Sequence, residues 1–327
     1  MKLSSMQLVG STVRTDQSCQ IAEKILECWG YDDGSDRTVR FSTNFVFVFR
    51  QQGIKRFLRF SPAWERRVEQ IRTETQLLMT LGNKGFQLAQ PVESKTGNLV
   101  ETVETELGAF HAVVFTAVIG KRLEIGDLSE SQFREWGSAL GRLRTASQDC
   151  GVEHLNRPSW KEHLDFVRVN IADDEPYLLR ELVSITTWAE SLPQSGENFG
   201  LIHFDFELDN LCWDGDTIQM LDFDDCAYHW FAADVALALR DLFDNEITVN
   251  FEDSRLKAFL KGYRAARPIN EEWVKCLPMF LRMRKLLGYV DLKNCIDLSM
   301  DQTQDWLKPL HRKLTHMMEQ YRLSLKA

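Results

Sequence analysis

Two kinds of hydrophobic pattern divide the chain of 327 residues. In the first third, extended runs rich in aromatic and β-branched residues predominate, as in residues 38–50, where alternate phenylalanines share one side. Glutamines and a glycine at 51–53 lead into a second such run, so these segments are predicted to form a β-hairpin. Further elements expected in this part are a short helix over 18–29, strands over 98–103 and 110–118, and one long helix that begins after Pro62 and stops at Gly82.

Beyond Gly120 the apolar residues recur at helical spacing instead. Only three short runs in this part read as extended: 200–203, 211–213 and 218–221. We therefore expect an α+β protein with two lobes, a small antiparallel β lobe with one main helix over residues 1–118 and a larger helical lobe over 119–327. The helices predicted in the second lobe are 129–145, 160–171, 176–191, 233–243, 254–264, 271–290 and a C-terminal run from 302.

Charge is distributed unevenly along the chain. With 39 Lys plus Arg against 48 Asp plus Glu, the formal charge is −9, which argues against a nucleic-acid-binding protein. Residues 203–253 contain fourteen acidic residues and a single basic one, Arg240. Such a cluster is either a solvated acidic face or a site that attracts metal ions or cationic substrates.

Cysteine usage and hydropathy indicate the compartment. The seven cysteines are scattered and include no C-x-x-C pair, so we expect core thiols rather than disulfides or a zinc site. No apolar run resembles a signal peptide or reaches the roughly 18 residues of a membrane-spanning helix. We expect a cytoplasmic protein that binds no membrane, and the sequence does not specify its oligomeric state.

Spaced polar residues follow the short extended runs of the second lobe. His203 and Asp205 follow the first run, Asn210 comes five residues after Asp205, and Asp222 comes twelve residues after Asn210. Polar residues at the ends of buried strands are where sites are commonly built. A carboxylate that accepts a proton, together with an amide oxygen and a second carboxylate that hold Mg²⁺, are the groups that phosphoryl transfer requires.

The pattern H-x-D-x-x-x-x-N followed by D-F-D resembles the catalytic and metal-binding loops of the aminoglycoside phosphotransferase and choline kinase-like superfamily, relatives of protein kinases. The resemblance covers most of the chain and implies a protein kinase-like fold, with ATP and Mg²⁺ as cofactors. It implies that Asp205 is the catalytic base and that Asn210 and Asp222 are the metal ligands. It further assigns structural roles in the catalytic loop to His203 and Asp234, and an additional metal or substrate contact to Asp224. Glu207 is open between a solvent-facing residue and a metal or substrate contact.

The resemblance also implies nucleotide contacts in the first lobe. Arg59 stands where a lysine is commoner, with Lys55 as the fallback, and Glu74 is the helix glutamate that fits best. Asn44 fits a position in the loop that covers the nucleotide, although residues 41–45 contain no glycine. The backbone that would bind adenine is that of Thr116, Ala117 and Val118.

Several residues depart from the family pattern or have simpler interpretations. Phe204 and Phe206 flank Asp205 where many relatives have Gly and Leu, and Arg144 stands where a His is frequent. His229 is expected to be a packed histidine, and the alternate phenylalanines of 45–49 to be core. The acids of W-D-G-D at 213–216 are expected in a hairpin turn.

These observations support three functional hypotheses. The first is an ATP- and Mg²⁺-dependent phosphotransferase that acts on a hydroxyl of a small molecule, with an acidic site that favours aminoglycosides, amino alcohols or amino acids. The alternative is a catalytically silent kinase-like protein that binds nucleotide or a partner, which the missing glycines and Arg59 suggest. A protein kinase is disfavoured because no activation segment rich in Ser and Thr follows Asp222.

Overall fold

The computed structural model describes residues 1–148, 155–171, 175–244 and 246–326. The chain forms two compact units. The first consists of Met1–Gly82, Leu88–Val118 and Lys293–His316, and the second of Asn83–Gln87, Ile119–Leu292 and Met317–Ala327. One break falls after Val118, where the sequence places the lobe boundary, but Lys293–His316 packs with the first unit rather than the second. The functional roles of the two lobes stay predictions.

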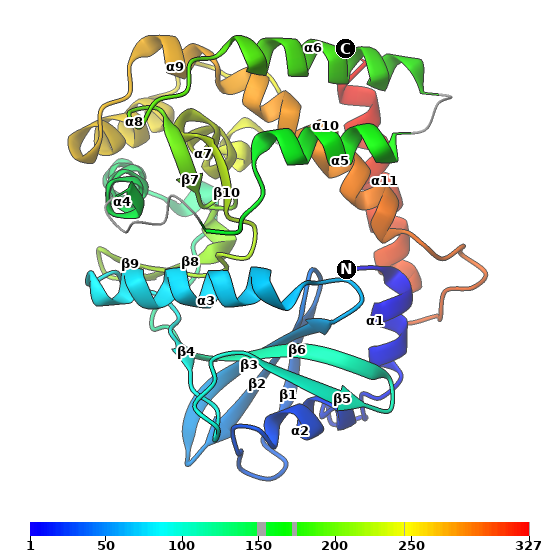
Figure 1. Ribbon diagram of the computed structural model, residues 1–327. Coiled ribbons are helices and arrows are strands. Elements are labelled where there is room, and N and C mark those ends of the chain that lie inside the picture. The colour runs from blue at the N-terminus through cyan, green and yellow to red at the C-terminus, as the bar shows by residue number, and fades with distance from the viewer. Residues whose placement is uncertain (149–154, 172–174, 245, 327) are drawn as a thin grey trace. The chain divides into compact units, whose positions relative to one another are not determined.

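A six-stranded sheet forms the centre of the first unit (Figure 1). All its neighbouring strands are antiparallel in the order β1-β2-β3-β6-β4, and β5 pairs with β6 as well. The predicted hairpin turn is confirmed, because Gln52 and Gly53 both have positive φ, at 52° and 75°. The strands are β1 Arg37–Phe41, β2 Phe45–Gln51, β3 Ile54–Pro62, β4 Pro91–Val92, β5 Glu101–Thr105 and β6 Gly108–Thr116.

The extended run 38–50 forms two strands, β1 and β2, and the turn between them falls within 41–45, where the sequence analysis expects a loop. Within this turn the N–H of Ser42 donates to the carbonyl of Asn44 at 3.2 Å. Three polar residues in succession, 42–44, interrupt the alternation of apolar and polar residues and mark the position of this turn.

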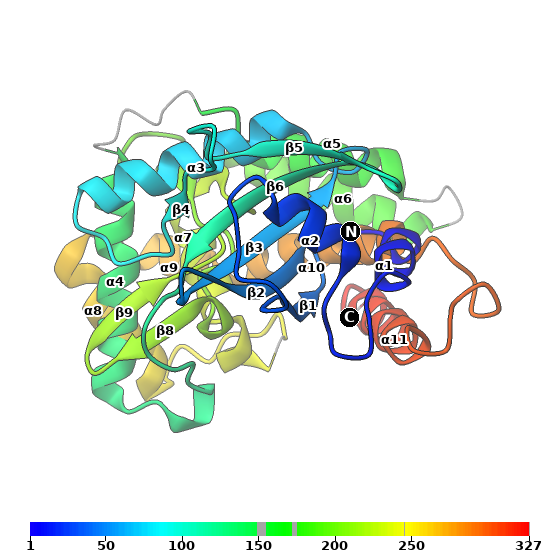
Figure 2. The same ribbon diagram turned by 90° about the horizontal axis from the view of Figure 1, so that it is seen from below.

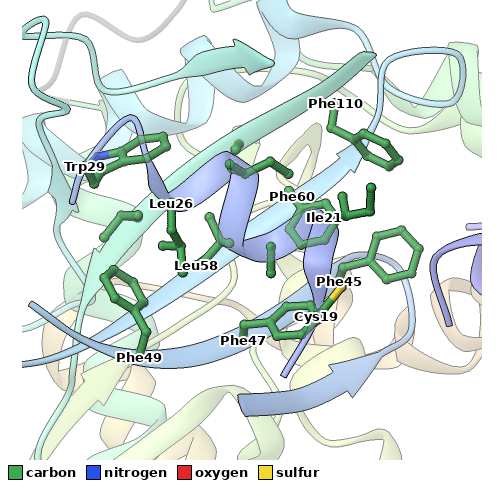
Figure 3. Packing of buried hydrophobic residues seen from close by; sticks show 14 of the residues in the cluster. Cys19, Ile21, Leu26, Trp29, Phe45, Phe47, Phe49, Leu58, Phe60 and Phe110 are labelled. Carbon is green, nitrogen blue, oxygen red and sulfur yellow. The ribbon is translucent and has the colours of Figure 1, made fainter. Parts of the chain in front are cut away.

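One face of the sheet packs against α2, Gln20–Leu26. Figure 3 shows Ile21 and Leu26 of this helix among Phe45, Phe47 and Phe60, all at most 1% exposed. Complete burial of each such side chain contributes about 2–3 kcal/mol. The alternating phenylalanines are therefore core residues, as expected.

The other face of the sheet carries α3, Val68–Asn83 (Figure 2). Arg59 points to this face because its neighbours Leu58 and Phe60 belong to the α2 side. A helix that the sequence analysis missed, α1 Leu3–Gly10, packs Leu3 and Met6 against Leu307, which explains why Lys293–His316 joins this unit.

Helices dominate the second unit. The predicted helix 271–290 is interrupted between α9 and α10, because Pro278 has no N–H to donate to the carbonyl of Val274. Likewise 233–243 divides into α7 and a 3₁₀ turn, η4. The helices here are α4 Glu130–Gln148, α5 Trp160–Asn170, α6 Pro176–Ser191, α7 Phe231–Ala238, α8 Ser254–Ala266, α9 Glu271–Lys275 and η4 Arg240–Phe243, while α10 Leu277–Cys295 and α11 Lys308–Ser324 cross between the units.

Two small sheets position the loops that carry the spaced polar residues. β7, Phe199–Ile202, pairs antiparallel with β10, Ala227–Trp230, a strand that the sequence analysis missed. Between them lies the hairpin of β8, Leu211–Asp214, and β9, Thr217–Met220, with the predicted turn at Gly215. This order places the loop after β7 and the loop after β9 on either side of the same hairpin.

Among the described residues, no helix has the length and apolar character needed to cross a membrane. The six described cysteines are free thiols, and the seventh, Cys150, lies outside the described residues.

Candidate active site

The loop after β7 is fixed by hydrogen bonds to its backbone. The N–H groups of His203 and Phe204 donate to the two carboxylate oxygens of Asp234, at 3.1 and 2.9 Å. The ring of His203 is fully buried, and its Nε2 lies 3.1 Å from the carbonyl oxygen of Leu221, while its Nδ1 accepts from the N–H of Asp205. Burial lowers the pKa of His203. A neutral ring with its proton on Nε2 therefore ties the two loops together.

Asp234 is itself buried with a counter-charge. Its carboxylate is 0% exposed and lies 3.3 Å from Nε of Arg144, whose side chain is 2% exposed. Arg144 also donates to the carbonyl of Leu201 in β7. The arginine that departs from the family pattern thus neutralises the buried anchor and holds the preceding strand.

The side chains of Asp205 and Asn210 are in direct contact. Nδ2 of Asn210 donates to both the carbonyl and Oδ2 of Asp205, at 3.0 and 2.7 Å. The other carboxylate oxygen of Asp205, Oδ1, accepts from Nη1 of Arg240 at 3.1 Å. Asp205 remains 20% exposed, so the carboxylate is held on both sides and still reaches the surface of its unit.

Asp222 lies next to these residues because β9 ends beside Asn210. The N–H of Leu221 donates to the carbonyl of Asn210 at 2.9 Å, and Asp222 follows with a left-handed backbone, φ 58°. Such a conformation is unusual for a residue other than glycine and is commonest for Asp and Asn among the exceptions. The structure therefore brings together His203, Asp205, Asn210, Asp222 and Asp234.

The chemistry of these groups fits a magnesium ion. Both donors of the Asn210 amide are directed at Asp205, so its carbonyl oxygen could serve as a metal ligand together with the carboxylate of Asp222. No cluster of three or more His, Cys, Asp or Glu side chains that could hold a metal occurs in the part of the chain that the structure describes. Mg²⁺ commonly binds through one or two protein oxygens together with waters and substrate phosphates, so this set suffices.

Glu207, a candidate metal or substrate contact, is bound by Arg240. Nη2 of Arg240 donates to Oε2 of Glu207, whose side chain is 14% exposed. Burial raises the pKa of the Glu207 carboxyl to about 7, although the charge of Arg240 opposes this rise. In this structure the Glu207 carboxylate is thus part of an ion-pair cluster with Arg240 and Asp205.

Asp224 is buried in the loop after β9, with 5% of its surface exposed. Its carbonyl accepts from Arg157, and Nε of the same arginine donates to the carbonyl of Cys226 at 2.8 Å. Arg157 therefore braces the backbone of the loop that begins with Asp222.

Phe204 adopts a left-handed backbone, with φ 69°. This conformation favours glycine, which is the residue that the family resemblance leads us to expect at this place. In this chain its ring packs 4.9 Å from the ring of His163 and 5.9 Å from that of His229. His229 is the packed histidine that the sequence predicted.

The residues predicted to contact nucleotide lie in the first unit. Nη1 of Arg59 donates to Oε1 of Glu74 at 2.9 Å, and the guanidinium also lies over the ring of Phe115, 5.0 Å from its centroid. Lys55, the fallback, lies over Phe57 instead. The structure thus brings together the basic residue and the helix glutamate that the resemblance pairs.

The remaining predicted nucleotide contacts are backbone positions and Asn44. The N–H of Thr116 donates to the carbonyl of Gln90 at 2.8 Å, which leaves Ala117 and Val118 as the positions with an N–H to offer adenine. Asn44 is 5% exposed in the turn between β1 and β2.

Sequence reasoning missed the roles of three arginines: Arg144, Arg157 and Arg240. Each acts through a residue far along the chain, so no local motif marks it. Two of them carried a sequence signal: Arg240 as the single base in a segment of fourteen acids, and Arg144 as a departure from the family pattern.

Comparisons with known proteins identify the family of this chain. The model of the phosphotransferase enzyme family matches residues 35–269, which include the loops described above. The chain is 25% identical over 291 residues to an amicoumacin kinase of Bacillus subtilis (strain 168), covering 86% of each chain. It is also 28% identical over 216 residues to a homoserine kinase of Mesorhizobium japonicum, covering 63% of each.

Solved structures show the same fold. An amicoumacin kinase in complex with AMP-PNP, Ca²⁺ and Ami has a TM-score of 0.75 at 24% identity, covering 92% of each chain. A microcompartment-associated aminopropanol kinase has a TM-score of 0.70 at 22% identity, covering 93% of this chain and 94% of its own. The predicted kinase-like α+β fold is confirmed. This chain belongs to the phosphotransferase enzyme family and is a small-molecule kinase.

Proposed function

We propose that this kinase transfers the γ-phosphoryl group of ATP, with Mg²⁺, to a hydroxyl of a small molecule that also carries an amino group. The observation that carries the proposal is the carboxylate of Asp205, fixed through both oxygens beside Asn210 and Asp222. A relative bound to AMP-PNP and Ca²⁺ supports the use of ATP and a divalent metal.

In the proposed reaction Asp205 orients the acceptor hydroxyl and accepts its proton. The hydroxyl oxygen forms a bond to the γ-phosphorus while the bond from this phosphorus to the β,γ-bridging oxygen breaks, which releases ADP. Asn210 and Asp222 would hold Mg²⁺, which neutralises charge on the phosphates when bound. Arg59, held by Glu74, would contact a phosphate, and Asn44 with the backbone of Ala117 and Val118 the rest of the nucleotide.

The acceptor class rests on two observations. Relatives are named as kinases of homoserine and aminopropanol, and both compounds carry a hydroxyl and an amino group. The segment 203–253 has fourteen acids and one base, which would favour a cationic acceptor. Because Arg240 already pairs with two of these acids, the attraction comes from the rest of the segment. Asp224 stays a candidate for a further metal or acceptor contact, and the free thiols fit the cytoplasm, where ATP is available.

The test is ADP release by the purified chain with amicoumacin, homoserine and aminopropanol, each with and without Mg²⁺. We expect Mg²⁺-dependent turnover with at least one of them. Tight binding of a non-hydrolysable ATP analogue without turnover on any hydroxylated amine would instead support the silent kinase-like protein. Phosphorylation of a generic protein substrate in preference to all three would favour a protein kinase.

A further inference from the structure

Arg240 bridges two carboxylates of the loop that carries Asp205. Its Nη1 donates to Oδ1 of Asp205 at 3.1 Å, and its Nη2 donates to Oε2 of Glu207. All three side chains are mostly buried, with exposures of 21, 20 and 14%. The planar guanidinium presents its donors in a fixed fork, so one side chain restrains both carboxylates at once.

The bridge determines how the Asp205 carboxylate is turned. Asn210 holds Oδ2 at 2.7 Å and Arg240 holds Oδ1, so rotation about the bond to the carboxyl carbon would break one contact or the other. The two donors come from different elements, η3 (Leu208–Asn210) and η4. The orientation of a reacting group strongly affects rate, and a displacement of 1 Å can cost about 100-fold.

The same stretch of chain also fixes the backbone beneath this carboxylate. Asp234 in α7 binds the N–H groups of His203 and Phe204, and Arg240 follows six residues later in η4. One continuous segment, residues 234–240, thus positions both the backbone of the loop and the side chain of Asp205. Glu207 holds the guanidinium of Arg240 in turn, because it accepts from Nη2 while Nη1 binds Asp205.

We infer that Arg240 is a positioning residue that sets the orientation of the Asp205 carboxylate for phosphoryl transfer, and that Glu207 holds Arg240 in place instead of binding the acceptor. This inference rests on the proposed function. It differs from a purely structural role, in which Arg240 would only neutralise two buried acids, because it requires an effect on the chemical step.

The test compares kcat and the acceptor KM of variants, using whichever of amicoumacin, homoserine and aminopropanol the wild type phosphorylates fastest. For Arg240→Met we expect kcat to fall by about 100-fold, with the acceptor KM changed by less than about threefold. Arg240→Lys should recover part of the rate, because an ammonium restores the charge without the fork. Glu207→Gln should lower kcat in the same direction and leave the KM near the wild-type value.

Controls separate positioning from folding. If Arg240→Met alone unfolds, the double variant Arg240→Met with Glu207→Gln takes its place. The double variant loses one charge of each sign, so it leaves no net change in the buried charge of the pair. Arg264→Met removes a surface pair with Glu271, 2.6 Å apart, and should leave both constants unchanged. All rates are normalised to the fraction of protein that binds nucleotide.

Two results would overturn the inference. One is a folded Arg240→Met, alone or combined with Glu207→Gln, whose kcat equals that of the wild type. The other is a Glu207→Gln variant that raises only the acceptor KM, which would make Glu207 an acceptor contact. A wild type that phosphorylates none of the three compounds would instead defeat the proposed function, and this inference with it.

Discussion

The carboxylate of Asp234 has no exposed surface, and its partners compensate its negative charge. Two backbone N–H groups and Arg144 surround it, and Arg144 is itself 2% exposed. A buried ion pair adds little net stability compared with apolar residues, but removal of one partner leaves the other charge buried without compensation. The stability of the loop therefore depends on both members of this pair.

For Arg144→Met we expect a loss of about 3–5 kcal/mol in the free energy of unfolding, because the Asp234 charge is left uncompensated. Urea denaturation measures this value. Arg142→Met, which removes an exposed pair with Glu135 about two turns away along α4, should cost at most about 1 kcal/mol and serves as the control. Equal stabilities of the two variants would contradict this account of Asp234.

At the scale of elements, α4 and α8 lie side by side in both views of the ribbon (Figure 1 and Figure 2). Glycines make their close approach possible. A Cβ added at Gly137 would overlap the carbonyl of Phe259, and one at Gly262 would overlap the carbonyl of Arg134. Because both neighbours are backbone atoms, neither can turn aside. α4 supplies Trp136 and Arg144, so this packing also supports the site.

We expect Gly262→Ala to destabilise the protein, although alanine is the better helix former by about 1 kcal/mol. The clash outweighs this gain, because overpacking typically costs about 1–3 kcal/mol and here it would separate two helix backbones. Thermal unfolding measures the difference. Gly126→Ala is the matched control, since a Cβ there meets no atom within 4 Å. A Gly262→Ala variant at least as stable as the wild type would refute the close packing.

Helices and strands whose apolar residues recur at regular spacing could be predicted from the sequence. Elements whose form depends on tertiary contacts could not. The helix 176–191 was predicted with its observed bounds, since its apolar face and N-terminal proline are local signals. β10 was missed because its aromatic residues are buried on both sides and show no alternation. The interruption before Pro278 carried a local signal that the periodic pattern obscured.

In the candidate site too, residues marked by local spacing could be predicted, and residues brought in by tertiary contacts could not. The loop residues were found because their spacing in sequence is short and regular, and the structure places them in contact. Arg240 contacts Asp205 across 35 residues, so only the folded chain reveals it. The left-handed backbone at Phe204 was also beyond prediction, because a phenylalanine gives no local sign of positive φ.

At the scale of the whole molecule, buried histidines make stability depend on pH, and besides His203 these include His163 and His229. Burial lowers the pKa of His163 to about 4, with Arg284 and Arg157 acting in the same direction and Glu162 against it. Burial and His163 lower the pKa of His229 as well. Both groups bind protons more weakly in the folded state than in the unfolded state, where the pKa is about 6.5.

Their contribution to stability is therefore full above pH 6.5 and is lost as the pH falls from 6.5 toward 4. We expect the Tm to fall between pH 7 and pH 5, and His163→Phe, which keeps a ring beside Phe204, to show a shallower fall. Scans of the two proteins across this range give the comparison. Parallel curves would mean that His163 does not carry the effect.

The most direct measurement of the central claim is phosphoester formation followed by ³¹P NMR, with the wild type and Asp205→Asn in the presence of Mg·ATP and the best acceptor. Asparagine keeps the size of the side chain but cannot accept the proton of the hydroxyl. The account predicts product with the wild type and a rate lower by at least about 100-fold with Asp205→Asn, at unchanged nucleotide affinity. An Asp205→Asn variant that forms the phosphoester at the wild-type rate would contradict it.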